Sequence, residues 1–292
     1  MPEAKIGVIG GTGLYAMEEM PNVEEVRVST PFGEPSDTIT VGVLDGKGIA
    51  FLPRHGKGHR INPTEIPSRA NIYALKSLGV ERIISVNSAG SFREEIKPGD
   101  LVIPDQIIDR TRSRVNTFFE GGLVAHIPFA DPFCPVLSGL LYQAACDIGA
   151  TAHKGGTYLA MEGPLFSTRA ESRLYRSWGA DIIGMTPLPE AKLAREAEIC
   201  YASIACVSDY DSWHGEHEPV SVEVIVDTMR RNIATARSII KLVVTRIPEE
   251  RECICATALK DAIVTSPKCI PVQLKKNLSL LIEKYISLRD NE

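Results

Sequence analysis

The sequence predicts an α/β fold in a single domain, and three observations support this prediction. Short β-branched runs alternate with longer segments of helical period, which is typical of a largely parallel sheet covered by helices. The 292 residues, 44% of them hydrophobic, suffice to bury a core. Neither a repeat of fixed period nor a low-complexity segment divides the chain.

The N-terminal part is expected to form several strands followed by a helix. Asp45-Gly46 is a hairpin-turn signal between two of these strands. Apolar positions in helical rhythm end at Gly79, a candidate C-terminal cap. Strands are expected at residues 5–9, 26–30, 38–44 and 48–53, and the helix at 62–79.

The remaining chain continues the alternation and ends in a helical extension. Pro248 is expected to stop a long helix that Ser221 caps. Beyond it, residues 249–271 are hinge-like, and apolar spacing predicts a C-terminal helix over 274–288, packed back on the body. Strands are expected at 82–88, 101–108, 156–162, 181–186 and 200–209, and helices at 135–149, 168–178, 188–198 and 221–247.

Composition excludes several classes of protein. A net charge of −5 without a basic block argues against nucleic-acid binding. The apolar run after Ile239 is cut by Lys241 and Arg246, so no membrane span is expected, and the N-terminus does not resemble a secretion signal. The chain is therefore expected to be cytoplasmic.

Seven scattered cysteines, an odd number, fit a reducing compartment. Cys253-Ile254-Cys255 could ligate zinc together with Cys269 or form a strained bridge, but idle thiols are the favoured interpretation. His55 and His59 are not expected to bind a metal, because Gly56 and Gly58 disfavour the helix that this spacing needs. No metal site is therefore predicted.

The first candidate binding motif is Gly10-Gly11-Thr12-Gly13, directly after the first strand. Its backbone N–H groups could converge on an anion, and Thr12 adds a hydroxyl donor. A dinucleotide site or a plain turn are the alternatives, although the acidic residue of a dinucleotide fingerprint is missing. The motif therefore indicates a phosphate contact first.

Further polar motifs follow other predicted strands. Arg54-His55 could bind phosphate through the planar guanidinium group, and the alternative is a solvated basic loop. Asn87-Ser88 lies near the carboxyl end of a central strand, where ligands bind in open α/β sheets. Phe166 could stack on a base or pack in the core, and Met185-Thr186 stands at a strand end in a Pro-rich connection.

Asp209 and Asp211 close the last predicted strand. Residues two apart in extended chain point to one face, and neighbouring carboxylates raise one another's pKa. One carboxyl could then stay protonated near neutral pH beside an ionised acceptor. The alternatives are an ordinary acidic turn and, less favoured, a calcium loop, for which further spaced ligands are missing.

Taken together, these motifs resemble the trimeric purine nucleoside phosphorylases, and within them the branch that acts on 5′-methylthioadenosine. The resemblance spans roughly residues 5–245. It is carried by Gly10-Gly11-Thr12-Gly13, residues 30–37, Arg54-His55-Gly56, residues 93–100, residues 126–135, Glu162-Gly163-Pro164, residues 169–172, Gly184-Met185-Thr186, Pro189-Glu190 and Asp209-Tyr210-Asp211.

The resemblance implies a central mixed, twisted β-sheet flanked by helices in a phosphorylase domain over 1–248. Residues 249–292 take no part in the resemblance and are expected to form an extension packed on the same domain. The resemblance also implies phosphorolysis of methylthioadenosine, with inorganic phosphate as co-substrate and no cofactor. Phosphate would be held by Thr12, Arg54, His55, Asn87, Ser88 and Thr186. The nucleoside would contact Phe166, Met185, Asp209, Tyr210 and Asp211.

Specific roles are also implied by the resemblance. Asp209 would protonate purine N7, and Asp211 would accept from the 6-amino group. Ser167 would influence which purine base is preferred. Val222 and Ile225 would form the apolar wall around the methylthio group, and the alternative for these two residues is ordinary core packing. His126 would reach a neighbouring subunit's site, which implies a homotrimer.

Three other functions remain open. A phosphorylase for 6-oxopurine nucleosides or methylthioinosine would favour neutral residues at the positions of Asp209 and Asp211. A nicotinamide-dependent dehydrogenase would build on Gly11-Thr12-Gly13, and a nucleotide-binding sensor would bind without turnover.

Overall fold

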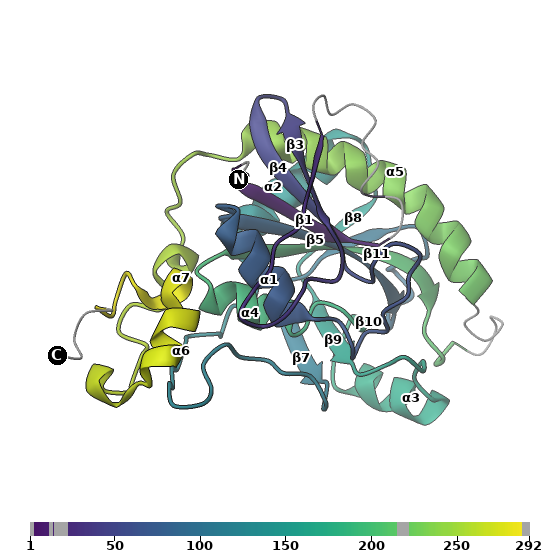
Figure 1. Ribbon diagram of the computed structural model, residues 1–292. Coiled ribbons are helices and arrows are strands. Elements are labelled where there is room, and N and C mark those ends of the chain that lie inside the picture. Colours follow the sequence, from purple (N-terminus) through teal and green to yellow (C-terminus); the bar gives the residue numbers. More distant parts are fainter. Residues whose placement is uncertain (1–2, 12–13, 15–22, 215–221, 288–292) are drawn as a thin grey trace.

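The computed structural model describes residues 3–11, 14, 23–214 and 222–287, without the side chains of residues 222–227, 229 and 231. A twisted sheet crosses the middle of the molecule and helices lie on both of its faces (Figure 1). In the described part of the chain, no helix combines the length and the apolar character needed to cross a membrane.

The sheet has 11 strands and is mixed, as predicted. Its main path runs β2-β3-β4-β1-β5-β10-β9-β7, while β11 pairs with β5 and β6, and β8 pairs with β6. The strands are β1 (Ile6–Gly10), β2 (Glu24–Val26), β3 (Ile39–Leu44), β4 (Lys47–Pro53), β5 (Arg82–Ser91), β6 (Leu101–Ile103), β7 (Gln106–Arg110), β8 (Ala152–Lys154), β9 (Thr157–Met161), β10 (Ile182–Gly184) and β11 (Cys200–Tyr210).

Strand β5 organises the sheet. Its first residues pair in parallel with β1, its whole length pairs in parallel with β11, and its last two residues pair antiparallel with β10. Because β10 runs back along β5, the end of β10 returns towards the middle of β5 rather than continuing past it. The ends of β4, β10 and β11 thereby gather around the second half of β5.

Helices bury the two faces of the sheet separately. Residues of α1 (Ser68–Ser77) and α4 (Glu190–Glu196) belong to one apolar cluster, which also contains residues of β1 and β4. Residues of α2 (Pro135–Asp147) and α5 (Val222–Arg246) belong to a second cluster with the opposite side chains of β1 and β11. The short α3 (Arg169–Ser177) begins with a capping box between Thr168 and Glu171.

The C-terminal segment packs on the α1 and α4 side, at the lower left of Figure 1. It contains two 3₁₀ turns, η1 (Ile254–Thr257) and η2 (Pro267–Cys269), and two helices, α6 (Val272–Asn277) and α7 (Ser279–Ile282). The single helix expected over 274–288 is wrong: Leu278 adopts ψ near 4° and divides α6 from α7. Ala125 bridges to Ile263, so this segment also contacts the loop before α2.

The structure confirms two predictions made from local sequence, the hairpin turn at Asp45-Gly46 and the helix end at Gly79. Asp45 and Gly46 have φ of 47° and 79°, as the predicted two-residue hairpin turn between β3 and β4 requires, and Gly79 follows α1 with φ of 88°.

The sequence analysis was wrong about three other boundaries and missed one strand. The strand expected over 101–108 is two strands, because Pro104 cannot donate a ladder hydrogen bond and the chain turns there. Helix α1 begins at Ser68 rather than 62, after Pro63 and Pro67. Strand β2 covers Glu24–Val26 rather than 26–30, and β8 was not predicted.

Candidate active site

Arg54 follows β4 and is almost fully buried. Its Nε donates to Glu190 Oε1 at 2.5 Å, while Nη2 donates to Glu190 Oε2 at 3.1 Å and to Ser85 Oγ at 2.6 Å. Nη1 donates to the carbonyl of Val86 at 2.9 Å. The fork that was expected to hold phosphate is thus already paired with Glu190, and of its five N–H groups one on Nη1 remains for an anion.

His55 lies next to Arg54 and is buried. Its Nδ1 lies 2.8 Å from the carbonyl oxygen of Ile61, so Nδ1 carries the proton and donates it. Burial and the charge of Arg54 lower the pKa of His55 to about 4. The imidazole is therefore neutral at pH 7, and it stacks on His59 with ring centroids 4.2 Å apart.

Asn87 and Ser88 occupy the second half of β5. Asn87 is buried, and its amide contacts the hydroxyls of Ser85 and Ser203 at 3.3 and 3.1 Å. Ser88 Oγ lies 2.8 Å from Ser208 Oγ on the neighbouring strand β11. The side chains of these two predicted phosphate ligands are thus held in hydrogen bonds at the centre of the sheet.

Met185 and Thr186 directly follow β10. Thr186 is buried. Met185 packs on Gly163, where a Cβ would come within 2.4 Å of its sulfur. Arg114, a residue that the sequence analysis did not select, donates to the backbone carbonyls of Met185, Leu188 and Glu162 and so fixes the loop after β10 to the end of β9.

Gly184 stands where no side chain fits. A Cβ there would lie 1.9 Å from Tyr158 Oη and 3.0 Å from the carbonyl oxygen of Ser88. Tyr158, on β9, is fully buried and fills this space, and its hydroxyl donates to the Ser88 carbonyl at 3.4 Å. Tyr158 therefore accounts for a glycine directly before Met185.

Asp209 and Asp211 both lie against Gly90 of β5, as their spacing predicted. A Cβ on Gly90 would meet Asp209 Oδ1 at 2.9 Å and Asp211 Cβ at 3.3 Å. Ser208 Oγ donates to Asp209 Oδ2 at 2.6 Å, and Ser167 Oγ donates to both carboxylate oxygens of Asp211 at 2.7 and 2.6 Å. A shift in the pairing of β11 with β5 between Val207 and Asp209 accompanies this arrangement.

The pKa of Asp209 is raised to about 6, chiefly by burial. The hydroxyl of Ser208 opposes this rise, and the charge of Asp211 adds the smallest part of it. The expectation that the carboxylate pair itself causes the shift is therefore corrected: desolvation comes first. The pKa of Asp211 is raised as well, again chiefly by burial.

The remaining predicted residues border this region or lie apart from it. Ser167 is buried at Asp211, Phe166 beside it is 42% exposed, and Tyr210 donates to the carbonyl of Glu94 at 3.2 Å. His126 is exposed, and its backbone N–H donates to Ala262 of the C-terminal segment at 2.9 Å. Thr12 lies outside the described residues, as do the side chains of Val222 and Ile225.

Four residues that shape this region were missed from sequence. Arg114 stands in the basic run 110–114, which could have marked it, but nothing local distinguishes Tyr158 or Ser208. Glu190 was quoted only within a motif, and its pairing with Arg54 across 136 residues has no sequence signal.

Comparison with known proteins identifies the family of the chain. Residues 5–245 match the Phosphorylase superfamily. The chain is 59% identical to the S-methyl-5′-thioadenosine phosphorylase of Geobacter sulfurreducens, over 97% of this chain and 100% of the relative.

Solved structures give the same result. A methylthioadenosine phosphorylase from an Antarctic soil metagenomic library superposes with a TM-score of 0.92 and 48% identity, covering 97% of this chain and 100% of that one. The methylthioadenosine phosphorylase of Schistosoma mansoni, in complex with adenine, gives a TM-score of 0.80 and 35% identity, covering 96% and 98%. With its mixed sheet, its site around β5 and these relatives, the chain belongs to the phosphorylase superfamily.

Proposed function

We propose that this chain catalyses the reversible phosphorolysis of S-methyl-5′-thioadenosine to adenine and 5-methylthio-α-D-ribose 1-phosphate. The observation that carries the proposal is the pair of carboxyls at the end of β11: Asp211 is buried, and the partly buried Asp209 has a pKa of about 6. A carboxyl with that pKa can be protonated near neutral pH and give its proton to a leaving base. The names of the relatives supply the substrate.

In the proposed reaction, a phosphate oxygen bonds to C1′ as the bond from C1′ to N9 of adenine breaks. Asp209 donates its proton to N7, so the base leaves uncharged and Asp209 becomes a carboxylate. Asp211, whose two carboxylate oxygens share the hydroxyl hydrogen of Ser167, accepts from the 6-amino group. A carboxylate there favours a 6-amino group over a 6-oxo group, which offers no hydrogen to donate.

Phosphate would lie between β4, β5 and the loop after β10. We assign its contacts to the free Nη1 hydrogen of Arg54, to His55 and to Thr186, together with Thr12, Asn87 and Ser88. Supporting this, Arg54 is held rigidly by Glu190, so its one open N–H has a fixed direction. Met185 would cover the ribose, because Arg114 fixes its backbone and Gly163 leaves room for its sulfur.

The base would be bordered by Phe166 and Tyr210, and Val222 and Ile225 would wall the methylthio group. We further infer a homotrimer in which His126 contacts a neighbour's nucleoside. This inference is supported by the exposure of His126 and of apolar side chains on the same loop and near Ser167, namely Val115, Val124, Leu165 and Phe166. Light scattering coupled to gel filtration tests the assembly directly.

Three finer assignments accompany the reaction. Inorganic phosphate would be the co-substrate, and no cofactor would be needed. A cytoplasmic location is supported by the seven cysteines, none of which is paired in a disulfide. Residues 249–292 would form an extension of the domain 1–248, because Leu278 and Ile282 share a core cluster with Ile9 and Leu75.

The test is release of free base from methylthioadenosine, adenosine and inosine, each with and without phosphate. Phosphate-dependent release of adenine, fastest from methylthioadenosine, is expected. Preferred release of hypoxanthine would overturn the role given to Asp211. Asp209→Asn should lower turnover at least about 100-fold while phosphate affinity changes little, since a general acid contributes about that much.

A further inference from the structure

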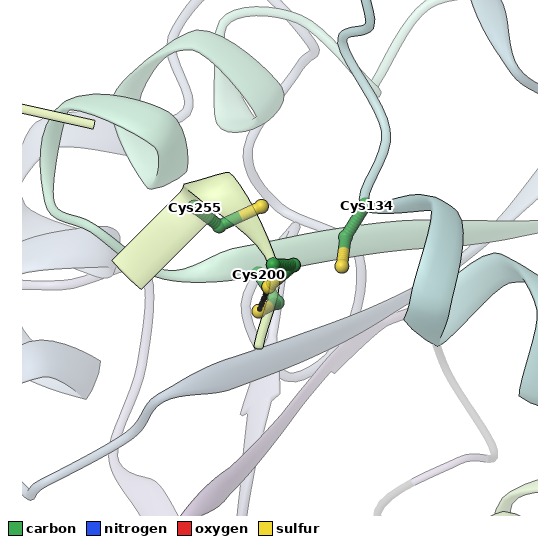
Figure 2. A group of neighbouring side chains, drawn as sticks. Cys134, Cys200 and Cys255 are labelled. Atoms are coloured by element: carbon green, nitrogen blue, oxygen red, sulfur yellow. Dashed lines mark hydrogen bonds between the residues drawn. The ribbon is translucent and has the colours of Figure 1, made fainter. Parts of the chain in front are cut away.

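Four cysteines from three distant parts of the chain meet at the end of the sheet opposite the site. The ligand atoms of Cys134, Cys200, Cys253 and Cys255 all lie within 4.8 Å of one another, and Cys253 alone of the four is not fully buried. Figure 2 shows the side chains of Cys134 and Cys255 beside Cys200. Cys269, which sequence grouped with Cys253 and Cys255, is exposed and is not part of this cluster.

Each thiol is carried by a fixed piece of backbone. Cys200 is the first residue of β11, and Cys134 precedes α2 with its N–H donating to the carbonyl of Tyr201 at 2.8 Å. Cys253 precedes η1, and its carbonyl accepts from the N–H of Ala256. The sulfur positions are therefore set before any ion binds, which lowers the ordering needed to form a site.

The segment that brings Cys253 and Cys255 to the sheet is also tied down. Arg82 donates to the carbonyls of Pro248, Glu249 and Glu250 at 2.6, 3.3 and 3.0 Å. Arg251 donates to the carbonyl of Glu198 at 2.6 Å. Both guanidinium groups also lie within 3.5 Å of the Glu81 carboxylate, which offsets their charge.

We propose that Cys134, Cys200, Cys253 and Cys255 form a tetrathiolate site for one Zn²⁺ ion. Zn²⁺ is bound tetrahedrally by four thiolates at about 2.3 Å, which places sulfurs about 3.8 Å apart, within the spread of this cluster. Four protein ligands leave no open position, so the site is structural. A cavity of about 190 Å³, lined by Cys134, Cys200, Cys253 and Arg82, gives the ion a path in.

Binding of Zn²⁺ to the four cysteines releases protons and changes the net charge of the cluster. Four thiols release four protons, and the four thiolates with Zn²⁺ carry a net charge of −2; two arginines, Arg82 and Arg251, and two glutamates, Glu250 and Glu252, line the same cavity. No electron transfer is involved, which distinguishes this site from two disulfides made from the same thiols.

The experiment measures metal in the full-length protein purified under reducing conditions. Elemental analysis should give about one zinc per chain for the wild type and about a tenth or less for Cys253→Ser/Cys255→Ser. The matched control is Cys146→Ser/Cys269→Ser, which removes two exposed thiols outside the cluster and should keep its zinc. Chelator should lower Tm in the wild type and the control, and should leave the cluster variant unchanged.

A second measurement does not depend on a variant that folds. Metal-free wild type should take up one equivalent of Co²⁺ and develop the intense visible absorption of a tetrahedral cobalt thiolate, and Zn²⁺ should then bleach it. A reduced chain that takes up neither ion would overturn the proposal. The proposal would also be overturned if the intact mass of the unreduced protein were lower than that of the reduced protein by four hydrogens, which indicates two disulfides. Iron in place of zinc in the purified protein would overturn it as well.

Discussion

Removing the hydroxyl of Ser208 should shift the pH range in which the chain can protonate a leaving base. Ser208 Oγ donates to Asp209 Oδ2 at 2.6 Å, and this bond opposes the effect of burial on the pKa of Asp209. A hydrogen bond to a charged group contributes about 1.5–3 kcal/mol. Since one pKa unit corresponds to about 1.4 kcal/mol, Ser208→Ala should raise the pKa from about 6 by at least about one unit.

The sign of the kinetic effect follows from the role of the acid. Asp209 must be protonated to donate, so kcat/KM falls as pH rises through its pKa. In Ser208→Ala that fall should begin about one unit higher. The assay is adenine release from methylthioadenosine at saturating phosphate between about pH 5 and pH 9.

Phosphate itself titrates in this range, so the comparison needs a matched control. Ser138→Ala removes another shielded serine hydroxyl, on α2 and away from Asp209, and its profile should superpose on the wild type. Because every protein meets the same phosphate titration, the difference between profiles isolates the carboxyl. A Ser208→Ala profile that coincides with the wild type, or moves to lower pH, would refute the assignment of Asp209 as the acid.

Three further variants test other contacts. Gly90→Ala should lower kcat at least about 10-fold with little change in fold, because the added methyl group would displace the Asp209 carboxyl. Unchanged kinetics would contradict this and would mean that the carboxyl can move freely. Glu190→Gln should cost about 3–5 kcal/mol in urea unfolding, since it leaves the Arg54 charge buried without its partner, and added phosphate should restore part of the loss; a loss under about 1 kcal/mol contradicts this. For Asp209→Asn, the free energy of unfolding minus that of the wild type should increase by about 3 kcal/mol as the pH rises from about 4 to about 7. The reason is that the pKa of Asp209 is raised from 3.8 to about 6 in the folded chain, so ionising Asp209 destabilises the wild type, whereas Asn does not ionise. A difference in urea unfolding that stays constant across that range would rule this out.

Much of the fold was predictable because its signals are local. The turn at Asp45-Gly46 and the cap at Gly79 need only the permitted backbone angles of their own residues. The two-residue period of extended chain likewise predicted that Asp209 and Asp211 lie on one face, and the Asp209 carboxyl and the Asp211 Cβ both lie against Gly90.

What escaped prediction depends on residues far apart in the chain. Tyr158 fills the space beside Gly184 only because β9 and β10 pair side by side. The thiols of Cys200 and Cys253 meet across 53 residues, and no local pattern chooses Cys200 over the exposed Cys269. The sequence analysis also linked the raised pKa of Asp209 to its charged neighbour, because desolvation cannot be judged before the packing is known.

The position of the C-terminal segment matters for how the chain is made in the cell. Leu278, Leu281 and Ile282 complete the same apolar cluster as Ile9, and Tyr73 donates to the carbonyl of Asn277 at 3.2 Å. Translation must therefore pass residue 282 before the face of the first-made strands is covered. Until then that face is open to chaperones and to aggregation, and a message cut short by a few dozen codons yields a product with an uncovered core.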